Sequence, residues 1–265
     1  MKTKVFLVVL LMVALVAVSF TPAMAREGKN LNDVRLGGWD TELYGQARID
    51  GVSFNFKGNG NFDKESSVDF FWKHKIGKLS DVSITYHNVE NSGTINVPVT
   101  INNIVFAANA NLTMEMSSID VLGYRELTSG PKGYIDFMYG LKFMDFDFDA
   151  NLGGVAASDS FTFPLPEIGV GGEYYFNDRW TFAGSFYGFS INRDDAGGLV
   201  KTFDTAVRYR FNPKHDSKVD KVDWYAELGW KAQYVSGHDD NATAGIRDEI
   251  TVDHEGLRFG IVGKF

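Results

Sequence analysis

The segment Glu255-Gly-Leu-Arg-Phe-Gly-Ile-Val-Gly-Lys-Phe265 alternates between two kinds of residue. Because successive side chains of a strand point to opposite faces, one face is apolar and carries Leu257, Phe259, Ile261 and Phe265. The other face carries Arg258, Gly260 and Lys264. Such a strand suits a membrane barrel with lipid outside and water or side chains inside. We also expect the four apolar residues to act as a recognition signal for barrel assembly.

Segments of similar composition recur along the chain, separated by breaks rich in Gly, Asn, Asp and Ser, a pattern typical of outer-membrane barrels. We expect an all-β fold, a closed antiparallel transmembrane barrel of about ten strands, at residues 42–56, 67–76, 80–90, 111–126, 133–149, 163–176, 180–192, 199–211, 222–235 and 251–265. The apolar alternation is clear in 133–149, 199–211 and 222–235, whereas the register of 111–126 and 180–192 is ambiguous. An even strand number is required if both termini are periplasmic.

The breaks between these segments alternate in length. Short breaks at 77–80, 128–133 and 177–179 predict periplasmic turns, with a longer, charged turn at 212–221. The breaks at 57–66, 150–162, 191–198 and 236–250 predict mobile outer loops. Within 91–110, two strand-forming stretches flank Asn102-Asn103, which predicts a hairpin that rises above the membrane as a tongue. The alternative is an irregular loop.

The N-terminus has the features of a secretory signal. Lys2 and Lys4 precede an apolar run from Val5 to Phe20, and Ala23-Met-Ala25 has the small-residue pattern of a cleavage site. We therefore expect residues 1–25 to be a cleaved signal peptide and 26–265 to form one barrel domain. The alternative, a membrane anchor, is disfavoured because the run is short for a bilayer span.

The amino-acid composition limits the chemistry and the partners that the protein can have. The chain has no cysteine, which excludes thiol catalysis and Cys-based metal sites. Without Lys2 and Lys4, the 26 basic residues fall to 24 against 34 acidic ones, a net charge of about −10, which argues against nucleic-acid binding. We expect no cofactor and a monomer in the outer membrane of a Gram-negative bacterium. Its expected partners are outer-membrane lipid, lipopolysaccharide, the barrel-assembly machinery and periplasmic chaperones.

Several stretches in the middle of the chain, taken in order, carry a resemblance to a known family. They are Phe71-Trp-Lys-His-Lys-Ile76, Leu79-Ser-Asp-Val-Ser-Ile-Thr-Tyr86, Ser118-Ile-Asp-Val-Leu-Gly-Tyr124, Gly140-Leu-Lys-Phe-Met-Asp145 and Phe163-Pro-Leu-Pro166. Over most of its length after residue 25, the sequence resembles a largely uncharacterised family of small proteobacterial outer-membrane β-barrel proteins. The resemblance implies the fold and the outer membrane, but it implies no catalytic or ligand-binding residues.

The faces opposite the apolar ones carry many long charged side chains, which we expect inside the barrel. The predicted lumen network comprises Arg48, Asp50, Asp69, Lys73, Asp136, Lys142, Glu167, Glu173, Asp204, Arg208, Arg210, Glu227, Lys231 and Arg258. Asp120 and Lys264 fall on the same faces. Because a buried charge is costly without a partner, this balance of signs predicts a mostly plugged lumen with a structural ion-pair network. The alternative is a narrow pore or small-solute conduit.

An outer-membrane enzyme is the third hypothesis. His215-Asp-Ser217 has the His-x-Ser spacing of lipid A deacylases but falls in a predicted periplasmic turn, and His238-Asp-Asp240 lies in an outer loop without the partners that omptin proteases use. Asp145, Asp147 and Asp149 share one face at an outer strand end. They are a solvated strand end or, alternatively, bridge to lipopolysaccharide phosphates through divalent cations. We therefore expect a non-enzymatic envelope protein with no catalytic or metal site.

Overall fold

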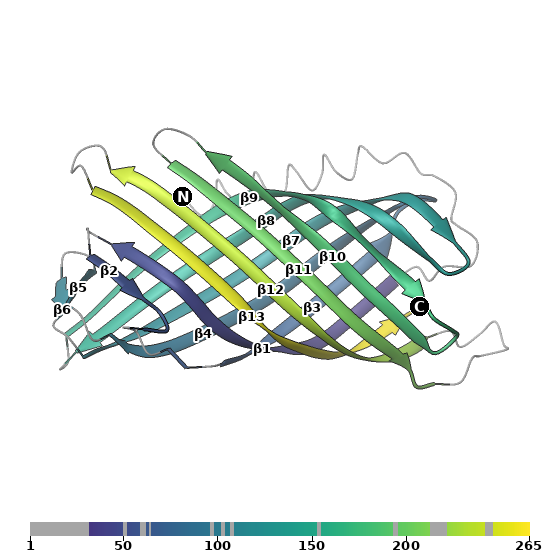
Figure 1. Ribbon diagram of the computed structural model, residues 1–265, viewed down its shortest axis with the longest axis horizontal. Coiled ribbons are helices and arrows are strands. Elements are labelled where there is room, and N and C mark those ends of the chain that lie inside the picture. The colour runs from purple at the N-terminus through teal and green to yellow at the C-terminus, as the bar shows by residue number, and fades with distance from the viewer. Residues whose placement is uncertain are drawn as a thin grey trace.

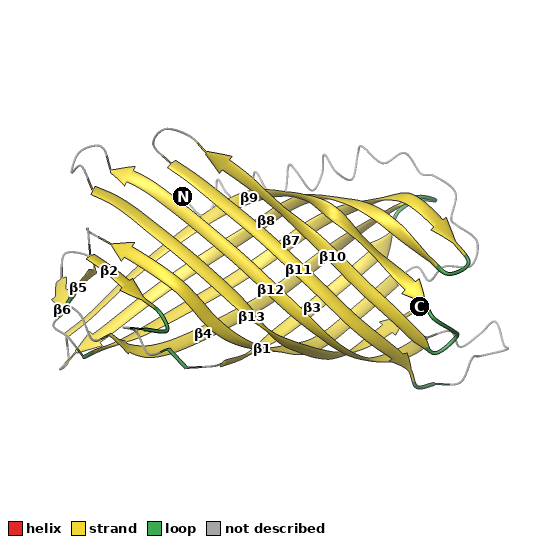
Figure 2. Ribbon diagram, in the orientation of Figure 1, coloured by secondary structure: helices red, strands yellow, loops and turns green. Residues whose placement is uncertain are grey.

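Antiparallel strands form every regular element of the computed structural model (Figure 2), which describes residues 32–49, 52–58, 62–63, 65–95, 98–101, 104–106, 109–152, 155–192, 196–212, 222–241 and 246–265. Over these residues, no helix is long and apolar enough to cross a membrane. The predicted signal peptide lies outside the described residues.

Ten strands pair side by side into a closed wall, long and steeply tilted (Figure 1). They are β1 (Asn32–Ile49), β3 (Glu65–Lys75), β4 (Ser80–Ile95), β7 (Ala110–Gly130), β8 (Gly133–Leu152), β9 (Val155–Tyr175), β10 (Trp180–Asn192), β11 (Ala196–Arg210), β12 (Asp223–Asn241) and β13 (Ile246–Lys264). Pairing of β13 with β1 closes the barrel. The predicted closed, antiparallel, ten-stranded barrel is thus confirmed.

The strand bounds differ from the prediction at both ends of the barrel. The first wall strand begins at Asn32 instead of 42, and the segment predicted as 42–56 turns back after Ile49 to form β2 (Val52–Asn55). The predicted loops at 150–162 and 236–250 are largely strand, because β8, β9, β12 and β13 continue beyond the level at which their apolar alternation stops.

An apolar belt surrounds one half of the barrel. Each wall strand contributes at least one large apolar side chain to the outer surface, and one example from each strand is between 37% and 62% exposed: Leu36, Val68, Ile84, Ile119, Phe137, Ile168, Phe186, Phe203, Leu228 and Leu257. A continuous ring of this kind is far larger than the apolar patches of water-soluble monomers. It is the surface expected of a wall in contact with lipid.

Beyond the belt, the polarity of the wall reverses, and β8 shows the change most clearly. Its outward face is apolar as far as Phe143 and then carries the exposed Asp145, Asp147 and Asp149. Its inward face carries Lys142 within the belt and then the fully buried Met144 and Phe146. The outer half therefore resembles a water-soluble barrel, with polar groups outside and an apolar core inside.

We call this apolar filling the outer core. Its buried members are Trp39, Leu43, Ala47, Phe56, Val89, Ile95, Phe106, Ala110, Leu112, Met114, Met116, Met144, Phe146, Ala150, Leu165, Val200, Val235 and Val252. The predicted hairpin around Asn102-Asn103 forms as β5 (Val99–Ile101) paired with β6 (Ile104–Phe106), while the two asparagines lie outside the described residues. Phe106 joins the outer core, so the hairpin packs on the barrel instead of standing away from it.

The opposite end carries the short turns and the C-terminus (Figure 1). The backbones of Asn32 and Phe265 exchange two hydrogen bonds, of 2.7 and 2.9 Å, so the last residue completes the seal between β1 and the terminal strand. Leu257, Phe259, Ile261 and Phe265 are each about half exposed on the outer face of the belt. Their predicted role as an assembly signal needs this accessibility before insertion.

Deleting Phe265 should impair assembly more than folding. We expect about tenfold less folded protein in the outer membrane, because the terminal residue would no longer be available to the assembly machinery; a tenfold change corresponds to about 1.4 kcal/mol. Heat-modifiable mobility of the barrel in membrane fractions measures this yield. Refolding of the purified variant into detergent should be close to normal, and equal losses in both assays would contradict the recognition role.

Candidate functional site: the charged interior

The half of the barrel inside the apolar belt is filled by charged side chains. Of the fourteen predicted lumen residues, the structure places twelve inside the wall: Asp69, Lys73, Asp136, Lys142, Glu167, Glu173, Asp204, Arg208, Arg210, Glu227, Lys231 and Arg258. Asp120 and Lys264 are buried with them. The inward parity predicted for these segments therefore agrees with the structure.

Two predicted lumen residues differ. Arg48 is exposed, because odd-numbered residues of β1, such as Trp39 and Leu43, face inward and even-numbered ones face outward. The prediction placed it inside because it assumed a charged interior along the whole strand, whereas Arg48 lies in the outer half, where the charged face is the outer one. Asp50 lies outside the described residues.

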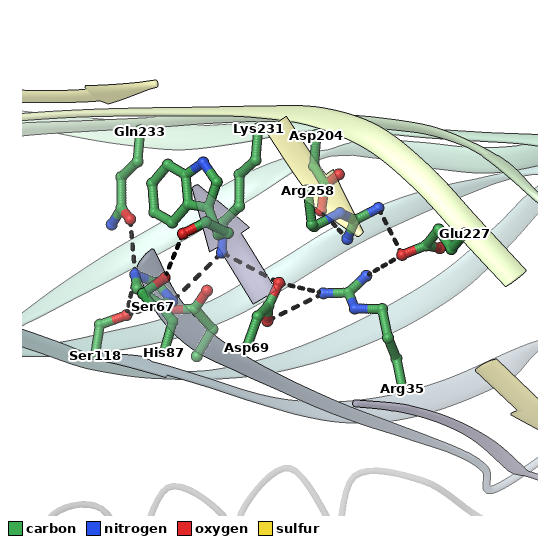
Figure 3. A network of polar contacts seen from close by, with 12 residues as sticks. Arg35, Ser67, Asp69, His87, Ser118, Asp204, Glu227, Lys231, Gln233 and Arg258 are labelled. Atoms are coloured by element: carbon green, nitrogen blue, oxygen red, sulfur yellow. Dashed lines mark hydrogen bonds and ion pairs between the residues drawn. The ribbon is translucent and has the colours of Figure 1, made fainter. Parts of the chain in front are cut away.

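The central group of ion pairs links strands that are not neighbours in the wall (Figure 3). Arg35 of β1 donates to Asp69 of β3 at 3.0 Å and lies 3.7 Å from Glu227 of β12. Glu227 also lies 3.1 Å from Arg258 and 2.6 Å from Arg208. It is therefore the common partner of three arginines.

Smaller groups of ion pairs fill the rest of the charged interior. Glu173 of β9 accepts from Arg208 and from Lys264, the latter at 2.7 Å. Lys73 lies 3.0 Å from Asp81 and 3.3 Å from Asp136. On another side of the lumen, Lys142 pairs with Asp120 and lies 3.6 Å from Glu167. Lys264–Glu173 and Lys73–Asp136 link strands that are not neighbours in the wall, which ties the wall together across its interior.

A layer of neutral polar side chains, which includes His87 and His254, lies between the charged interior and the outer core. Lys231 Nζ lies 3.8 Å from Asp69 and 3.5 Å from His87 Nδ1 (Figure 3). It also lies 4.7 Å from the centre of the Trp39 ring. The two buried histidines, His87 and His254, both meet Trp39 edge-on, at ring distances of 5.9 and 6.1 Å. Trp39 thus lies where the charged and apolar fillings meet.

The tautomers of these histidines follow from their partners. His87 Nε2 lies 2.7 Å from Gln233 Oε1, and His254 Nε2 lies 3.1 Å from Asn91 Oδ1. Each Nε2 therefore carries the proton that it donates to the amide oxygen. The Nδ1 atom of His87 is left as an acceptor facing the Lys231 ammonium, which is compatible only with a neutral ring.

A cavity of about 90 Å³ remains within the charged interior. Its lining includes Lys73, Tyr124, Asp136, Glu173 and Arg208. Arg35 and Arg258 also line the cavity. Their Nε atoms have no hydrogen-bond partner in the described part of the chain. Because buried polar groups without protein partners are normally satisfied by ordered water, we expect this cavity to hold a few water molecules.

Three residues of this interior were missed by sequence reasoning: Arg35, His87 and His254. Arg35 precedes the predicted start of its strand, and its neighbours Gly37 and Gly38 weaken the apolar alternation that would have identified it. The two histidines lie on separate predicted strands, without metal-ligand spacing. Their shared packing on Trp39 could not be read from sequence spacing.

Over the residues that it describes, the structure does not bring the remaining histidine and aspartate motifs together into a site. His215 and Ser217 lie outside them, and His238 is half-buried near the outer end of β12. In the part of the chain that the structure describes, no group of three or more His, Asp or Glu side chains is arranged to hold a metal ion. Asp145, Asp147 and Asp149 are exposed on the outer wall, above the belt.

A closed ten-stranded antiparallel wall, an apolar belt outside it and charged side chains inside it define an outer-membrane β-barrel. The protein is accordingly placed in the outer membrane of a Gram-negative bacterium.

Comparison with known proteins agrees with this class. The outer membrane protease OmpT from Escherichia coli has a TM-score of 0.52 at 11% identity, over 92% of this chain and 99% of its own. AlkL and the attachment invasion locus protein Ail of Yersinia pestis have TM-scores of 0.40 and 0.36, at 12% and 9% identity. The AlkL match covers 93% of this chain and 95% of AlkL, and the Ail match covers 87% and 99%. No family model matches the sequence, and neither does any curated protein. The likeness to OmpT shows the fold alone, and the particular family named by the sequence resemblance stays a prediction.

Acid should weaken the barrel through His254. This residue lies beyond the belt, between the outward-facing Asp253 and Glu255, and burial together with Lys231 lowers its pKa to about 3. Because the folded pKa is below the unfolded value of about 6.5, His254 contributes stability that is complete above pH 6.5 and is lost as the pH falls toward 3.

We therefore expect the free energy of unfolding to fall between pH 6 and pH 4 less steeply in His254→Gln than in the wild type, by about 1.4 kcal/mol per pH unit. Urea unfolding in detergent, followed by tryptophan fluorescence, measures this slope. Equal slopes for His254→Gln and the wild type would refute the assignment.

Proposed function

We propose that this protein is a non-conducting, non-enzymatic barrel of the outer membrane, and that it meets its surroundings through the polar outer surface of its outer half. The observation that carries the proposal is the outer core. Side chains from all around the wall, including the fully buried Met114, Phe146, Val200 and Val252, occupy the space that a pore would need.

The charged interior supports the same proposal. Its side chains are paired across the lumen, and the cavity among them is about 90 Å³, which is small beside the 300–1,000 Å³ typical of ligand pockets. A barrel of about ten strands is also much closer to the filled eight-stranded barrels than to the sixteen-stranded porins. A structural or surface-interacting role in the envelope needs no passage through the lumen.

The proposed partners follow from the two outer surfaces. The apolar belt would contact lipid acyl chains, and the polar surface above it would contact the sugar and phosphate groups of lipopolysaccharide. During biogenesis, periplasmic chaperones and the barrel-assembly machinery would bind the chain. We propose that the folded protein is a monomer.

Planar-bilayer recording tests the proposal. The purified barrel should give no discrete channels in 1 M KCl, and Glu227→Gln, which changes only the inner half of the filling, should also be silent. Discrete and reproducible conductance of the wild type would contradict the proposal and favour the alternative, a narrow conduit for small solutes. A porin of the outer membrane inserted under the same conditions is the positive control.

A further inference from the structure

The wall is interrupted between β9 and β10. Their pairing runs from Tyr175 with Thr181 to Ile168 with Gly188 and stops there. Both strands continue outward through described residues, β9 to Val155 and β10 to Asn192. On their other sides they stay paired, β9 with β8 and β10 with β11. We call the unpaired stretch, between residues 164–167 and 189–192, the β9–β10 seam.

Two prolines account for the seam. The backbone N–H of Tyr175 donates toward the β8 side, to Lys132, and that of Phe176 donates to Trp180 on the β10 side. Because the direction of the N–H alternates along a strand, even-numbered residues of β9 direct it toward β10. Pro164 and Pro166 occupy two such positions and have no N–H to donate. The sequence itself therefore prevents regular pairing here, as expected of proline at a strand edge.

The inner side of the seam is closed by one aliphatic side chain. Leu165, between the two prolines, is buried and belongs to the outer core. A Cβ atom added to Gly198 of β11 would lie 3.6 Å from Leu165 Cδ2. The leucine side chain therefore reaches from β9 to β11 on the inner side of the wall, behind the residues of β10 that do not pair with β9.

The outer side of the seam lies at the outer border of the apolar belt. Pro164 pairs with Phe143, the last apolar residue on the outward face of β8 before Asp145. Ile168, 51% exposed, lies on the outward face of β9 next to the seam. Lys201, which is exposed, is paired in register with Gly188 at the point where the pairing stops. The outward face beside the seam thus carries an exposed isoleucine and a cation at the level where the belt ends.

We propose that the β9–β10 seam binds one acyl chain of an anionic outer-leaflet lipid, with the chain against Leu165 and the head group near Lys201. A strand from another protein is the other natural occupant of an open sheet edge, but Pro164 and Pro166 cannot donate backbone hydrogen bonds to it. A lipid chain needs no such donors. This inference goes beyond the proposed function and does not depend on whether the barrel conducts.

A disulfide across the seam tests the proposal. Extending the register from Ile168 and Gly188 sets Pro166 opposite Ser190, so Pro166→Cys with Ser190→Cys would lock the seam, and no native cysteine interferes. Val170→Cys with Phe186→Cys, directly paired in the intact wall, is the matched control. Each protein is reconstituted into phosphatidylcholine vesicles containing a little phosphatidylglycerol with a diazirine on one acyl chain, then irradiated and mapped by mass spectrometry.

We expect label on residues 164–168 and 189–191 to exceed that on exposed belt residues of β8 by about tenfold, or roughly 1.4 kcal/mol of preference. Oxidation of the seam pair should abolish the excess, reduction should restore it, and the control pair should have no effect. Uniform label around the belt, or an excess that survives the lock, would overturn the proposal.

Two single variants keep the test decisive if the locked pair does not fold. Leu165→Ala should increase the seam label because it removes the side chain that closes the inner side of the seam, and Lys201→Glu should reduce it because it repels the anionic head group. Replacing the phosphatidylglycerol probe by a phosphatidylcholine probe should weaken the label in the wild type but not in Lys201→Glu. Unchanged labelling in both variants would overturn the proposal.

Discussion

Glu227→Gln should destabilise the barrel by about 3–5 kcal/mol, because it removes one charge from a buried ion-pair network and leaves its partners uncompensated. Glu227 lies within 4 Å of Arg35, Arg208 and Arg258, and all four side chains are buried. Arg35 and Arg258 have other acidic partners, in Asp69 and Asp204, but neither partner can reach all three guanidinium groups. Urea unfolding in phospholipid vesicles, followed by tryptophan fluorescence, measures the loss.

Glu90→Gln makes the same chemical change on the outer surface of β4, where the side chain is exposed. This control should change the free energy of unfolding by no more than about 0.5 kcal/mol. If the two variants were equally stable, Glu227 would not be the central partner of the network.

Phe146→Ala should cost about 3–5 kcal/mol, the usual cost of deleting a buried aromatic ring from a packed core. Phe146 is fully buried in the outer core, beyond the apolar belt, where water and not lipid surrounds the wall. The loss should therefore persist in both detergent and vesicles. Urea unfolding in the two environments measures it.

Asp149→Ala, also on β8 but exposed on the outward face, is the matched control and should be within about 0.5 kcal/mol of the wild type. A small effect of Phe146→Ala would mean that the outer half of the barrel is not packed. The apolar filling on which the proposed function rests would then be wrong.

Within the belt, the sequence was enough to predict the faces of the clearly alternating strands, although it missed the first half of β1 and left the register of β7 and β10 open. Lipid outside and paired charges inside impose the same alternation on every strand, so Lys142, Arg208 and Glu227 could be assigned to the interior from parity alone. Beyond the belt the rule reverses, because water is outside and an apolar core is inside. This reversal explains why Arg48 was assigned to the wrong face and why 150–162 was predicted to be a loop.

The contacts of the interior could not be predicted, since they depend on which strands lie across the lumen. Lys231 and His87 are 144 residues apart, and only the closed barrel brings them together. The β9–β10 seam could not be predicted for the same reason. Pro164 and Pro166 are visible in the sequence, but only the register shows that their missing donors face β10 and not β8.

The reversal of polarity along the wall is the central claim, and a spin-label scan of β8 tests it most directly. Single cysteines at positions 135 to 149 of this cysteine-free chain would carry a nitroxide, and its collisions with oxygen and with a water-soluble nickel chelate would be measured in vesicles. We predict that odd positions through 143 favour oxygen, that 145, 147 and 149 favour the chelate, and that 144 and 146 are shielded from both. Chelate access at 144 and 146, or oxygen preference at 145 to 149, would contradict the account.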